Sequence, residues 1–513
     1  MELLKRPVRT YRTIEIRQTE ELFENSIIVP DSKPDVGAVL VSDAECFVTG
    51  VEKSGRMVEV SGEIKYRILY CSDTPDRRPE SIVARFPWSV SCPKPKTEGE
   101  IGVFARCRCQ HTEANAVNGR KIVARTVTAL LLRFYEIKSD ELGREISGEN
   151  VFLKTSTVNI VSLKDNANAV SKVSNTLALP NGSPAIKEIL YSRVNLGSPE
   201  INNREEEPEV EAKGTLYLLY QGDNMENSLE TVVLEFPVKL EPNVNAGNDG
   251  SLFMSTGLKS WDIDILEDND GLNTQVAVVL EVETDTQAMV NEEETVIEDA
   301  YALDYVLTLN KASKSLVIDE RELADNHEAR GRIRLDTDNA RLEEVLMVCA
   351  SERGLTTRLN ENKVEAQGTV GVDIVFICQG ENKELKSQMT ELPLAHSFNL
   401  PENGNWQVVE ACFYIDDVNF DINGSDSVEA SIKLKLKLRV ARTEEVLSTD
   451  SLIPNKDDNS NKRAPITLYF SQPNDSLWSI AKHYRIPPGR LAQENGLEAD
   501  VRLEAGKRLF VVG

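Results

Sequence analysis

Cys107, Cys109 and His111 come nearest to metal-site spacing, because two thiols and an imidazole alternate with single residues. In a strand this spacing places all three side chains on one face. A structural zinc site usually takes four ligands and paired Cys-x2-Cys spacing, which this segment does not supply. We therefore interpret the segment as an ordinary strand and expect neither a metal nor another cofactor in this protein.

An acidic stretch around Gly271 resembles a calcium-binding loop in composition. If Gly271 stood at the sixth position of such a loop, Leu266 would be the first ligand and Ala277 the last, and neither side chain binds calcium. A hairpin turn accounts better for the stretch, whose acidic residues are Asp262, Asp264, Asp268 and Asp270.

Enzyme chemistry finds little support in the sequence. There is neither a Gly-x4-Gly-Lys-Ser/Thr phosphate loop nor a Gly-x-Ser-x-Gly nucleophile turn. The four histidines are scattered at positions 111, 327, 396 and 483, which leaves few groups for acid–base chemistry near neutral pH. We expect a protein that is not an enzyme.

The C-terminal residues show a strand–helix–helix–strand pattern. Ile466, Leu468 and Phe470 alternate with polar residues and predict a strand, after which Asp475 could cap a helix. Pro488 favours the start of a second helix that ends at Asn495-Gly496. Gly506 then precedes a final strand with Leu509 and Val511. The first helix is predicted by apolar residues at helical spacing, namely Leu477, Ile480, Ala481 and Tyr484.

These residues resemble a LysM domain, through the run Asn474–Ala481, Tyr484, Ile486, Asn495-Gly496-Leu497 and Gly506. The sequence departs from the common pattern in having Asn474 where a glycine usually precedes the aspartate, and in ending Val511-Val512-Gly513. LysM domains bind N-acetylglucosamine polymers in a groove between two loops. The resemblance implies that this groove is formed by Asp475, Ser476, Leu477 and Trp478 on one side and by Asn495, Gly496 and Leu497 on the other.

The compartment changes what such a groove would bind. Met1–Pro7 lacks the apolar region of a secretory signal, and no segment is apolar over the roughly 18 residues that span a bilayer. We expect a cytoplasmic protein that meets no peptidoglycan, so that the groove recognises a protein. Trp478 lies one position off the apolar stripe of its helix and would be a partly exposed hot spot. The alternatives are that Trp478 only flanks the core, and that the domain binds glycan.

The rest of the chain repeats itself at intervals of about 150 residues. Similar strand-like runs surround Gly62, Gly214 and Gly368. Helix-like segments precede these glycines, at 34–40, 184–190 and 340–346. Turn pairs follow them, at Asn118-Gly119, Asp270-Gly271 and Asn423-Gly424, and such pairs favour type I′ hairpins.

We interpret the repeats as three antiparallel β domains, each with one short helix. Strand alternation is clearest at 431–439, and the choice between a sandwich and a barrel stays open. The predicted fold is mainly β, with a small C-terminal βααβ domain. The predicted divisions are an N-terminal segment 1–25, repeats at 26–140, 170–290 and 325–443, connectors at 141–169 and 291–324, a flexible linker 444–464 and the LysM domain 465–513.

The chain has 58 basic and 84 acidic residues and a net charge of −26, which disfavours nucleic acid and anionic membranes as partners. Most of the excess lies between 200 and 300, including Glu205–Glu207 and Glu292–Glu294. This acidic region is either a solvated face or a docking surface for a basic partner. The basic face of Lys433, Lys435, Lys437 and Arg439 indicates edge-strand protection or a solvated surface, with a grip on an acidic surface as the alternative. The eight sparse cysteines are expected to be reduced thiols.

Repeats followed by a LysM domain are similar to the SipL-like spore-coat morphogenetic proteins of clostridia, whose repeats are called SPOCS domains. This resemblance implies a scaffold in the mother-cell cytoplasm at the forespore surface, where it helps the coat attach. It also implies that the LysM domain binds the stage IV sporulation ATPase, SpoIVA, with other coat proteins as further partners.

Overall fold

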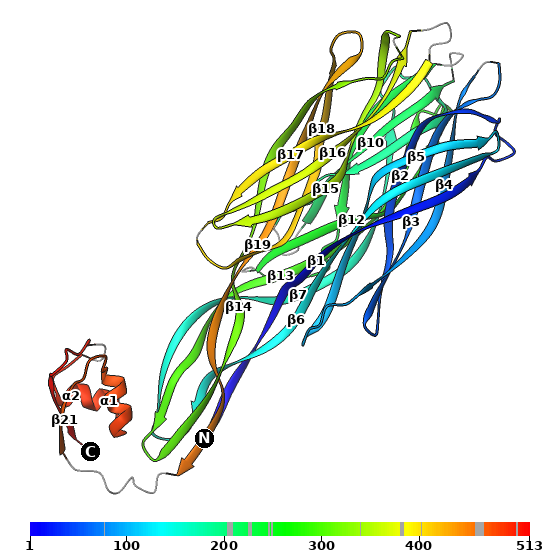
Figure 1. The fold of residues 1–513 in the computed structure, drawn as a ribbon. Helices are drawn as coiled ribbons and strands as arrows, with labels where there is room; N and C mark the ends of the chain where they lie inside the picture. The colour runs from blue at the N-terminus through cyan, green and yellow to red at the C-terminus, as the bar shows by residue number, and fades with distance from the viewer. Residues whose placement is uncertain are drawn as a thin grey trace.

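The computed structural model describes residues 1–75, 77–202, 209–223, 228–244, 247, 250–338, 340–379, 384–401, 403–456, 466–498 and 501–512. The protein is mainly β: strands β1 to β19 form an elongated body, and a small domain with both helices lies at one end (Figure 1). Both termini lie at that end. Among the described residues, no helix is long and apolar enough to cross a bilayer.

The first part of the body, which we call the first unit, contains two three-stranded antiparallel sheets, β1-β6-β5 and β2-β3-β4. Their bounds are β1 Glu2–Ile28, β2 Val36–Ser54, β3 Met57–Ser72, β4 Pro79–Pro93, β5 Glu100–Asn118 and β6 Lys121–Ser147.

The second unit has the sheets β7-β13-β12 and β8-β10-β11, with the short β9 paired to β10. The bounds are β7 Val151–Ala178, β8 Ile186–Leu196, β9 Glu200–Asn202, β10 Glu209–Gly222, β11 Leu229–Leu240, β12 Gly250–Leu266 and β13 Gln275–Ala302.

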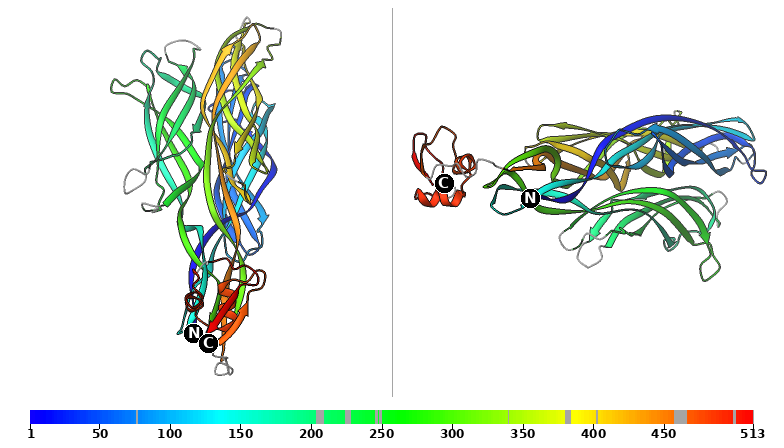
Figure 2. Two further views of the ribbon diagram at one scale, coloured as in Figure 1. Left: turned by 90° about the vertical axis from the view of Figure 1, so that its left-hand side faces the viewer. Right: turned by 90° about the horizontal axis from the view of Figure 1, so that it is seen from below.

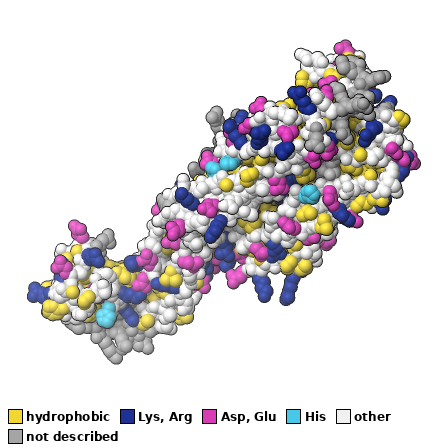
Figure 3. Space-filling view, turned by 45° about the horizontal axis from the view of Figure 1, so that its top comes forward, with side chains coloured by type: hydrophobic (Ala, Val, Ile, Leu, Met, Phe, Trp, Pro, Cys, Tyr) yellow, Lys and Arg dark blue, Asp and Glu magenta, His cyan; other side chains and the backbone are white. Residues whose placement is uncertain are grey.

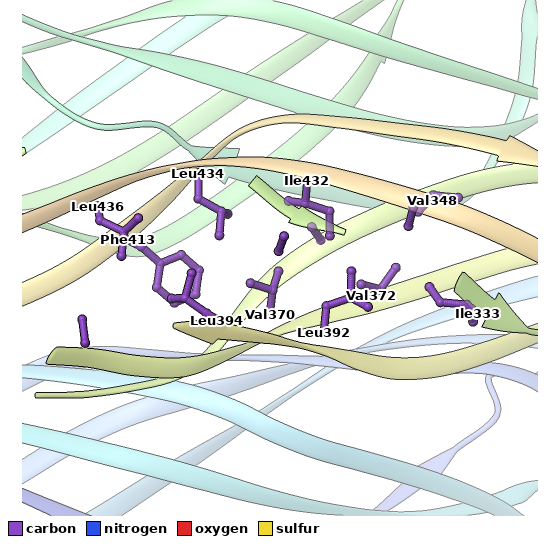
Figure 4. Close-up of a cluster of buried hydrophobic side chains, with 14 of the residues drawn as sticks. Ile333, Val348, Val370, Val372, Leu392, Leu394, Phe413, Ile432, Leu434 and Leu436 are labelled. Atoms are coloured by element: carbon purple, nitrogen blue, oxygen red, sulfur yellow. The ribbon is translucent and has the colours of Figure 1, made fainter. Parts of the chain in front are cut away.

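The third unit has the sheets β14-β19-β18 and β15-β16-β17, so the same strand order recurs in three consecutive segments of the chain. The bounds are β14 Tyr305–Arg334, β15 Leu342–Asn360, β16 Lys363–Cys378, β17 Glu384–Asn399, β18 Trp406–Ile422 and β19 Ser427–Lys456. The two sheets of this unit enclose a core that includes Val370, Leu394, Phe413 and Leu434 (Figure 4).

The glycines that mark the sequence period lie on the middle strands β3, β10 and β16. A Cβ atom at Gly62 would collide with the Trp88 ring and the Phe47 carbonyl, and one at Gly214 would collide with the Phe236 ring. Trp88 and Phe236 are the cross-strand partners of these glycines. Gly62 and Gly214 are therefore needed because large apolar side chains lie over them, whereas a Cβ atom at Gly368 would collide with the Gly354 carbonyl.

The helices expected at 34–40, 184–190 and 340–346 are wrong, because these segments are the beginnings of β2, β8 and β15. Each strand contains register shifts at this point, for example between Val39 and Val41 and between Val345 and Met347. A bulge adds a residue to the strand, so that apolar side chains recur after three positions instead of two. That spacing imitates the period of a helix.

The turn pairs do lie between adjacent antiparallel strands, but they do not form type I′ turns. Such a turn needs positive φ at both central residues. Only Gly271 and Gly424 have it, at 76° and 83°, whereas their preceding residues do not. Asn118-Gly119 has it at neither position.

One pair of cysteines departs from the expectation of reduced thiols. Cys46 on β2 and Cys107 on β5 form a disulfide with 5.5 Å between their Cα atoms. The two strands belong to different sheets of the first unit, and sequence spacing gave no sign that they meet. The other cysteines are buried thiols, at positions 71, 92, 109, 349, 378 and 412.

The long strands run past the sheets and form a shared extension that we call the stalk: residues 2–8, 141–147, 151–160, 292–302, 305–316 and 444–456. All three units supply its apolar core, which includes Val8, Ile160 and Leu316. The predicted segment 1–25 and connectors 141–169 and 291–324 thus lie largely in paired strands. Residues 444–456 of the predicted linker are the end of β19, and 457–464 lie outside the described residues.

The three units pack side by side (Figure 2), and buried charges join them. Arg133 of the first unit pairs with Asp285 of the second at 2.7 Å and with Glu410 of the third at 2.9 Å. In another cluster, Arg193 of the second unit lies 2.9 Å from Asp373 of the third and 3.5 Å from Asp43 of the first. Each cluster takes at least one member from every unit.

The basic face of β19 is not at a sheet edge, because β19 lies between β14 and β18. It is partly solvated, since Lys433 is exposed whereas Arg439 is buried. Lys435 pairs with Glu200 of the second unit at 3.0 Å, and Arg439 donates to Gln287 of the same unit. The face thus contacts the second unit of the same chain. Among the described residues, only Lys435 meets an acidic side chain there, while exposed Lys433 fits the solvated surface. Glu292 of the acidic region pairs with Arg6 at 3.1 Å, whereas 205–207 lie outside the described residues.

Candidate partner-binding site in the C-terminal domain

The C-terminal domain has the predicted element order, with β20 Ile466–Phe470, α1 Leu477–Tyr484, α2 Pro488–Glu494 and β21 Arg508–Val512. Strands β20 and β21 pair in antiparallel fashion. The helices cover one face of this two-stranded sheet and bury an apolar core that includes Leu477, Ile480, Ala481, Leu491, Leu509 and Val511.

The loop before α1 differs from the prediction in its helix cap. Ser476, and not Asp475, is the N-cap: its hydroxyl accepts from the Ser479 N–H at 3.1 Å, and the Ser479 hydroxyl accepts from the Ser476 N–H at 2.9 Å. The Asp475 carboxylate accepts from the Gln472 N–H and from the Tyr469 hydroxyl, both at 2.7 Å. The hydrogen bond that the Tyr469 hydroxyl donates to the Asp475 carboxylate raises the pKa of Tyr469. Asp475 therefore holds the preceding turn.

The loop after α2 is fixed by Asn495. Its side chain donates to the backbone oxygens of Phe510 at 2.7 Å and of Leu491 at 2.9 Å, and it accepts from the Phe510 N–H at 2.7 Å. Gly496 follows with a φ of 62°, and Leu497 is half-buried against the core. This loop is thus tied to β21 by side-chain bonds that any groove ligand would have to leave intact.

Two predicted groove residues do not point into a free groove. Leu477 is only 4% exposed and belongs to the core. Trp478 is half-buried against the stalk, where its indole N–H donates to the Asp299 carboxylate at 2.9 Å and its ring meets the Tyr301 ring edge-on at 5.0 Å. Leu477 is therefore a core residue and Trp478 packs against the stalk, so neither of these predicted partner-binding side chains lies free in a groove.

The geometry of the two loops, the helix pair and the paired strands agrees with one comparison. Residues 472–512 match the LysM domain family. No curated protein and no solved structure matches the chain. The match covers the C-terminal domain alone. A LysM domain indicates a binding function, towards peptidoglycan, another carbohydrate or a protein.

The LysM domain also exposes an apolar face that the sequence did not reveal as a surface. Ile466, Leu468 and Phe470 of β20 are 66%, 48% and 53% exposed, and Phe510 of β21 is 44% exposed. Leu468 and Phe510 are directly opposite one another in the two-stranded sheet. We call these four residues the outer sheet face. Hydrophobic side chains are visible at this end of the molecule in Figure 3.

The register shows which side of β20 faces the core, which its alternation alone does not tell. Tyr469 pairs with Leu509, which is fully buried, so the odd-numbered side of β20 faces the helices. The more apolar, even-numbered side of β20 therefore points away from the core. Comparing β20 with the pattern in β21 is the signal that could have assigned the two faces.

The metal candidates of the sequence do not form sites. Cys107 is in the disulfide with Cys46, and a register shift between Cys109 and His111 places those two on different faces, Cys109 buried and His111 exposed. Within the described ranges, no group of three His, Cys, Asp or Glu side chains could hold a metal ion.

The acidic stretch around Gly271 is a turn between β12 and β13, as expected. Asp268 accepts from the backbone N–H groups of Asp270 at 2.8 Å and Leu272 at 3.0 Å, and from the Thr274 hydroxyl at 2.6 Å. The bonds from Thr274 and Leu272 lower the pKa of Asp268. Its carboxylate stabilises the turn.

Proposed function

We propose that the protein is a non-enzymatic spore-coat morphogenetic scaffold of the mother-cell cytoplasm. Its LysM domain captures a protein partner, the sporulation ATPase SpoIVA of the coat basement layer, and so helps to tether the coat to the forespore surface. Three copies of one SPOCS-like β domain form the rigid body that spaces this LysM domain from further coat contacts.

The observation that carries the proposal is the outer sheet face. This exposed apolar surface lies on a LysM domain, a kind of domain that binds ligands, and consists of Ile466, Leu468, Phe470 and Phe510. Sugar recognition relies on polar groups as well as rings, whereas contiguous exposed apolar side chains favour a protein interface. The polar groups of the loops, those of Asp475, Ser476 and Asn495, are engaged in holding the loops themselves.

The body supports a structural role. Its buried charges, such as Arg133, Asp285 and Glu410, pair with one another across the units and fix how the units pack. The stalk places the LysM domain at one end of the elongated body (Figure 1). A scaffold with its binding domain at the end can hold a partner away from the rest of the layer.

A capture experiment with the full chain tests the proposal. We expect Leu468→Glu combined with Phe510→Glu to reduce co-purification of the co-expressed sporulation ATPase at least tenfold. The matched control is Val83→Glu combined with Val233→Glu, which adds the same two charges at exposed valines of the first and second units, 57% and 55% exposed. Undiminished capture by the double variant would show that the outer sheet face is not the contact. If the unaltered chain failed to capture the ATPase, the assignment of this ATPase as the partner would be wrong.

Glycan binding is the second candidate, and the family match favours it. Under this alternative the protein binds peptidoglycan or another N-acetylglucosamine polymer at the cortex or cell wall. Titration of muropeptides into the full chain separates the two functions: micromolar affinity would favour the glycan, and its absence together with capture of the ATPase would favour the scaffold.

A further inference from the structure

The LysM domain contacts the end of the stalk through polar groups at three points. The Asp299 carboxylate accepts from the Trp478 indole at 2.9 Å and from the Lys482 ammonium at 2.6 Å. The Tyr301 hydroxyl donates to the Ile486 carbonyl at 2.6 Å. These contacts follow α1 from its first turn to the loop beyond its end.

An apolar contact accompanies them. Tyr301 is buried and belongs to the same apolar cluster as Leu477 and Ile480, so the stalk adds a side chain to the LysM core. The Tyr301 ring meets Trp478 on one side and stacks on Phe152 of β7 at 5.4 Å on the other. The stalk end and α1 thus share one continuous interface.

The outer sheet face takes no part in this interface. In Figure 1, α1 lies on the side of the LysM domain towards the stalk, and β21 lies on the far side. A partner on the outer sheet face can therefore bind while the LysM domain is docked. A ligand that needs the Trp478 side of the loop groove cannot, because the stalk half-buries that side chain and accepts its indole N–H.

The covalent connection makes docking efficient. Residues 457–465 join β19 to the LysM domain. A connection this short gives an effective concentration in the millimolar range. A contact with an intrinsic Kd of about 100 µM would then be about nine-tenths formed.

We propose that the stalk end docks the LysM domain and thereby closes its loop groove to N-acetylglucosamine strands, so that the docked chain presents only the outer sheet face. Docking in this way decides which of two ligand classes the LysM domain admits, whatever the identity of the protein partner. If the domain is undocked one-tenth of the time, a glycan that needs Trp478 binds about tenfold more weakly than it would to the undocked domain.

Docking is tested first by fluorescence quenching of the full chain. Trp88, Trp261 and Trp406 are buried in the body, so the difference between the unaltered chain and Trp478→Phe isolates Trp478. We expect acrylamide to quench Trp478 several-fold more strongly in Asp299→Lys, which repels Lys482. The charge swap Asp299→Lys with Lys482→Asp should restore protection, and Glu293→Lys, an exposed position on the same strand, should change nothing. Strong quenching of Trp478 in the unaltered chain would overturn docking. Quenching in Asp299→Lys that equals quenching in the unaltered chain would overturn it as well.

The closure of the groove is tested by titrating tetra-N-acetylglucosamine into the same variants. We expect it to bind Asp299→Lys at least tenfold more tightly than the unaltered chain and Glu293→Lys. Equal affinity for all variants would overturn the proposal, because docking would then not cover the groove. Failure to bind any variant would also overturn it, because the groove would be closed for another reason. Either failure leaves capture of the ATPase by the outer sheet face as a separate result.

Discussion

At the scale of single residues, glycine recurs at Gly62 and Gly214 because a bulky side chain of the neighbouring strand lies over each of these positions. Gly62 has the Trp88 ring over it and Gly214 the Phe236 ring. The sequence predicted these glycines as landmarks of a repeat, but it could not tell why they are needed, because the covering side chains lie on the next strand.

A substitution at Gly62 tests this explanation. We expect Gly62→Ala to destabilise the protein by about 1–3 kcal/mol, because the new methyl group overpacks a core in which the Phe47 carbonyl is rigid backbone. The measurement is the midpoint of denaturant unfolding. Gly257→Ala is the matched control: no atom lies within 4 Å of its new Cβ, so its midpoint should stay the same or rise slightly.

At the scale of elements, the sequence predicted strands and the two C-terminal helices well, and failed where a strand is irregular. Alternation at 431–439 is correct, and Ile432, Leu434 and Leu436 are buried. The beginnings of β2, β8 and β15 read as helices because their bulges change the apolar spacing from two residues to three. A bulge is set by the partner strand, which a local pattern does not contain.

The candidate site shows the same limit. The helices, the loops and the LysM pattern could be predicted, since their signals are local. The contact of Trp478 with Asp299 could not, because the two residues are far apart in sequence and meet only when the stalk forms. The cap was assigned to the neighbouring residue because Asp475 and Ser476 are both suitable N-caps.

The cap of α1 gives a prediction at this scale. We expect Ser476→Ala to destabilise the LysM domain by about 1 kcal/mol, since the Ser479 N–H loses its acceptor. Hydrogen exchange of the α1 amides in the full chain should become roughly fivefold faster. Ser54→Ala, at an exposed serine at the end of β2, serves as the control. Equal exchange in both variants would contradict the role of Ser476.

At the scale of the whole molecule, the three units are held in one body by charges that each unit supplies. The sequence predicted three repeats separated by connectors, and the structure shows the same strand order in three consecutive segments. The stalk shows that the expected connectors are paired strands with a common core. An arrangement of this kind depends on contacts between residues more than a hundred positions apart, and no local pattern encodes them.

Glu410 is the test of this arrangement, because it is a third-unit carboxylate that meets Arg133 and Arg106 of the first unit and Ser255 of the second. Burial alone would raise its pKa, but the two guanidinium groups and the hydroxyl lower the pKa to about 2. A carboxylate with a lowered pKa stabilises the fold above its ordinary value of 4.5, and this contribution is lost as the pH falls from 4.5 through 2.

Glu410→Gln should therefore destabilise the protein at pH 7 by about 3–5 kcal/mol, because Arg133 and Arg106 lose a buried counter-charge. The difference in unfolding midpoint between the unaltered chain and this variant should shrink as the pH is lowered from 5 to about 2, since protonation then neutralises Glu410 in the unaltered chain as well. Glu429→Gln, at an exposed position of β19, removes the same charge without these partners and should leave the midpoint nearly unchanged at every pH. A difference for Glu410→Gln that stays constant over this range would mean that the carboxylate contributes through its shape alone, and that the charges do not hold the units together.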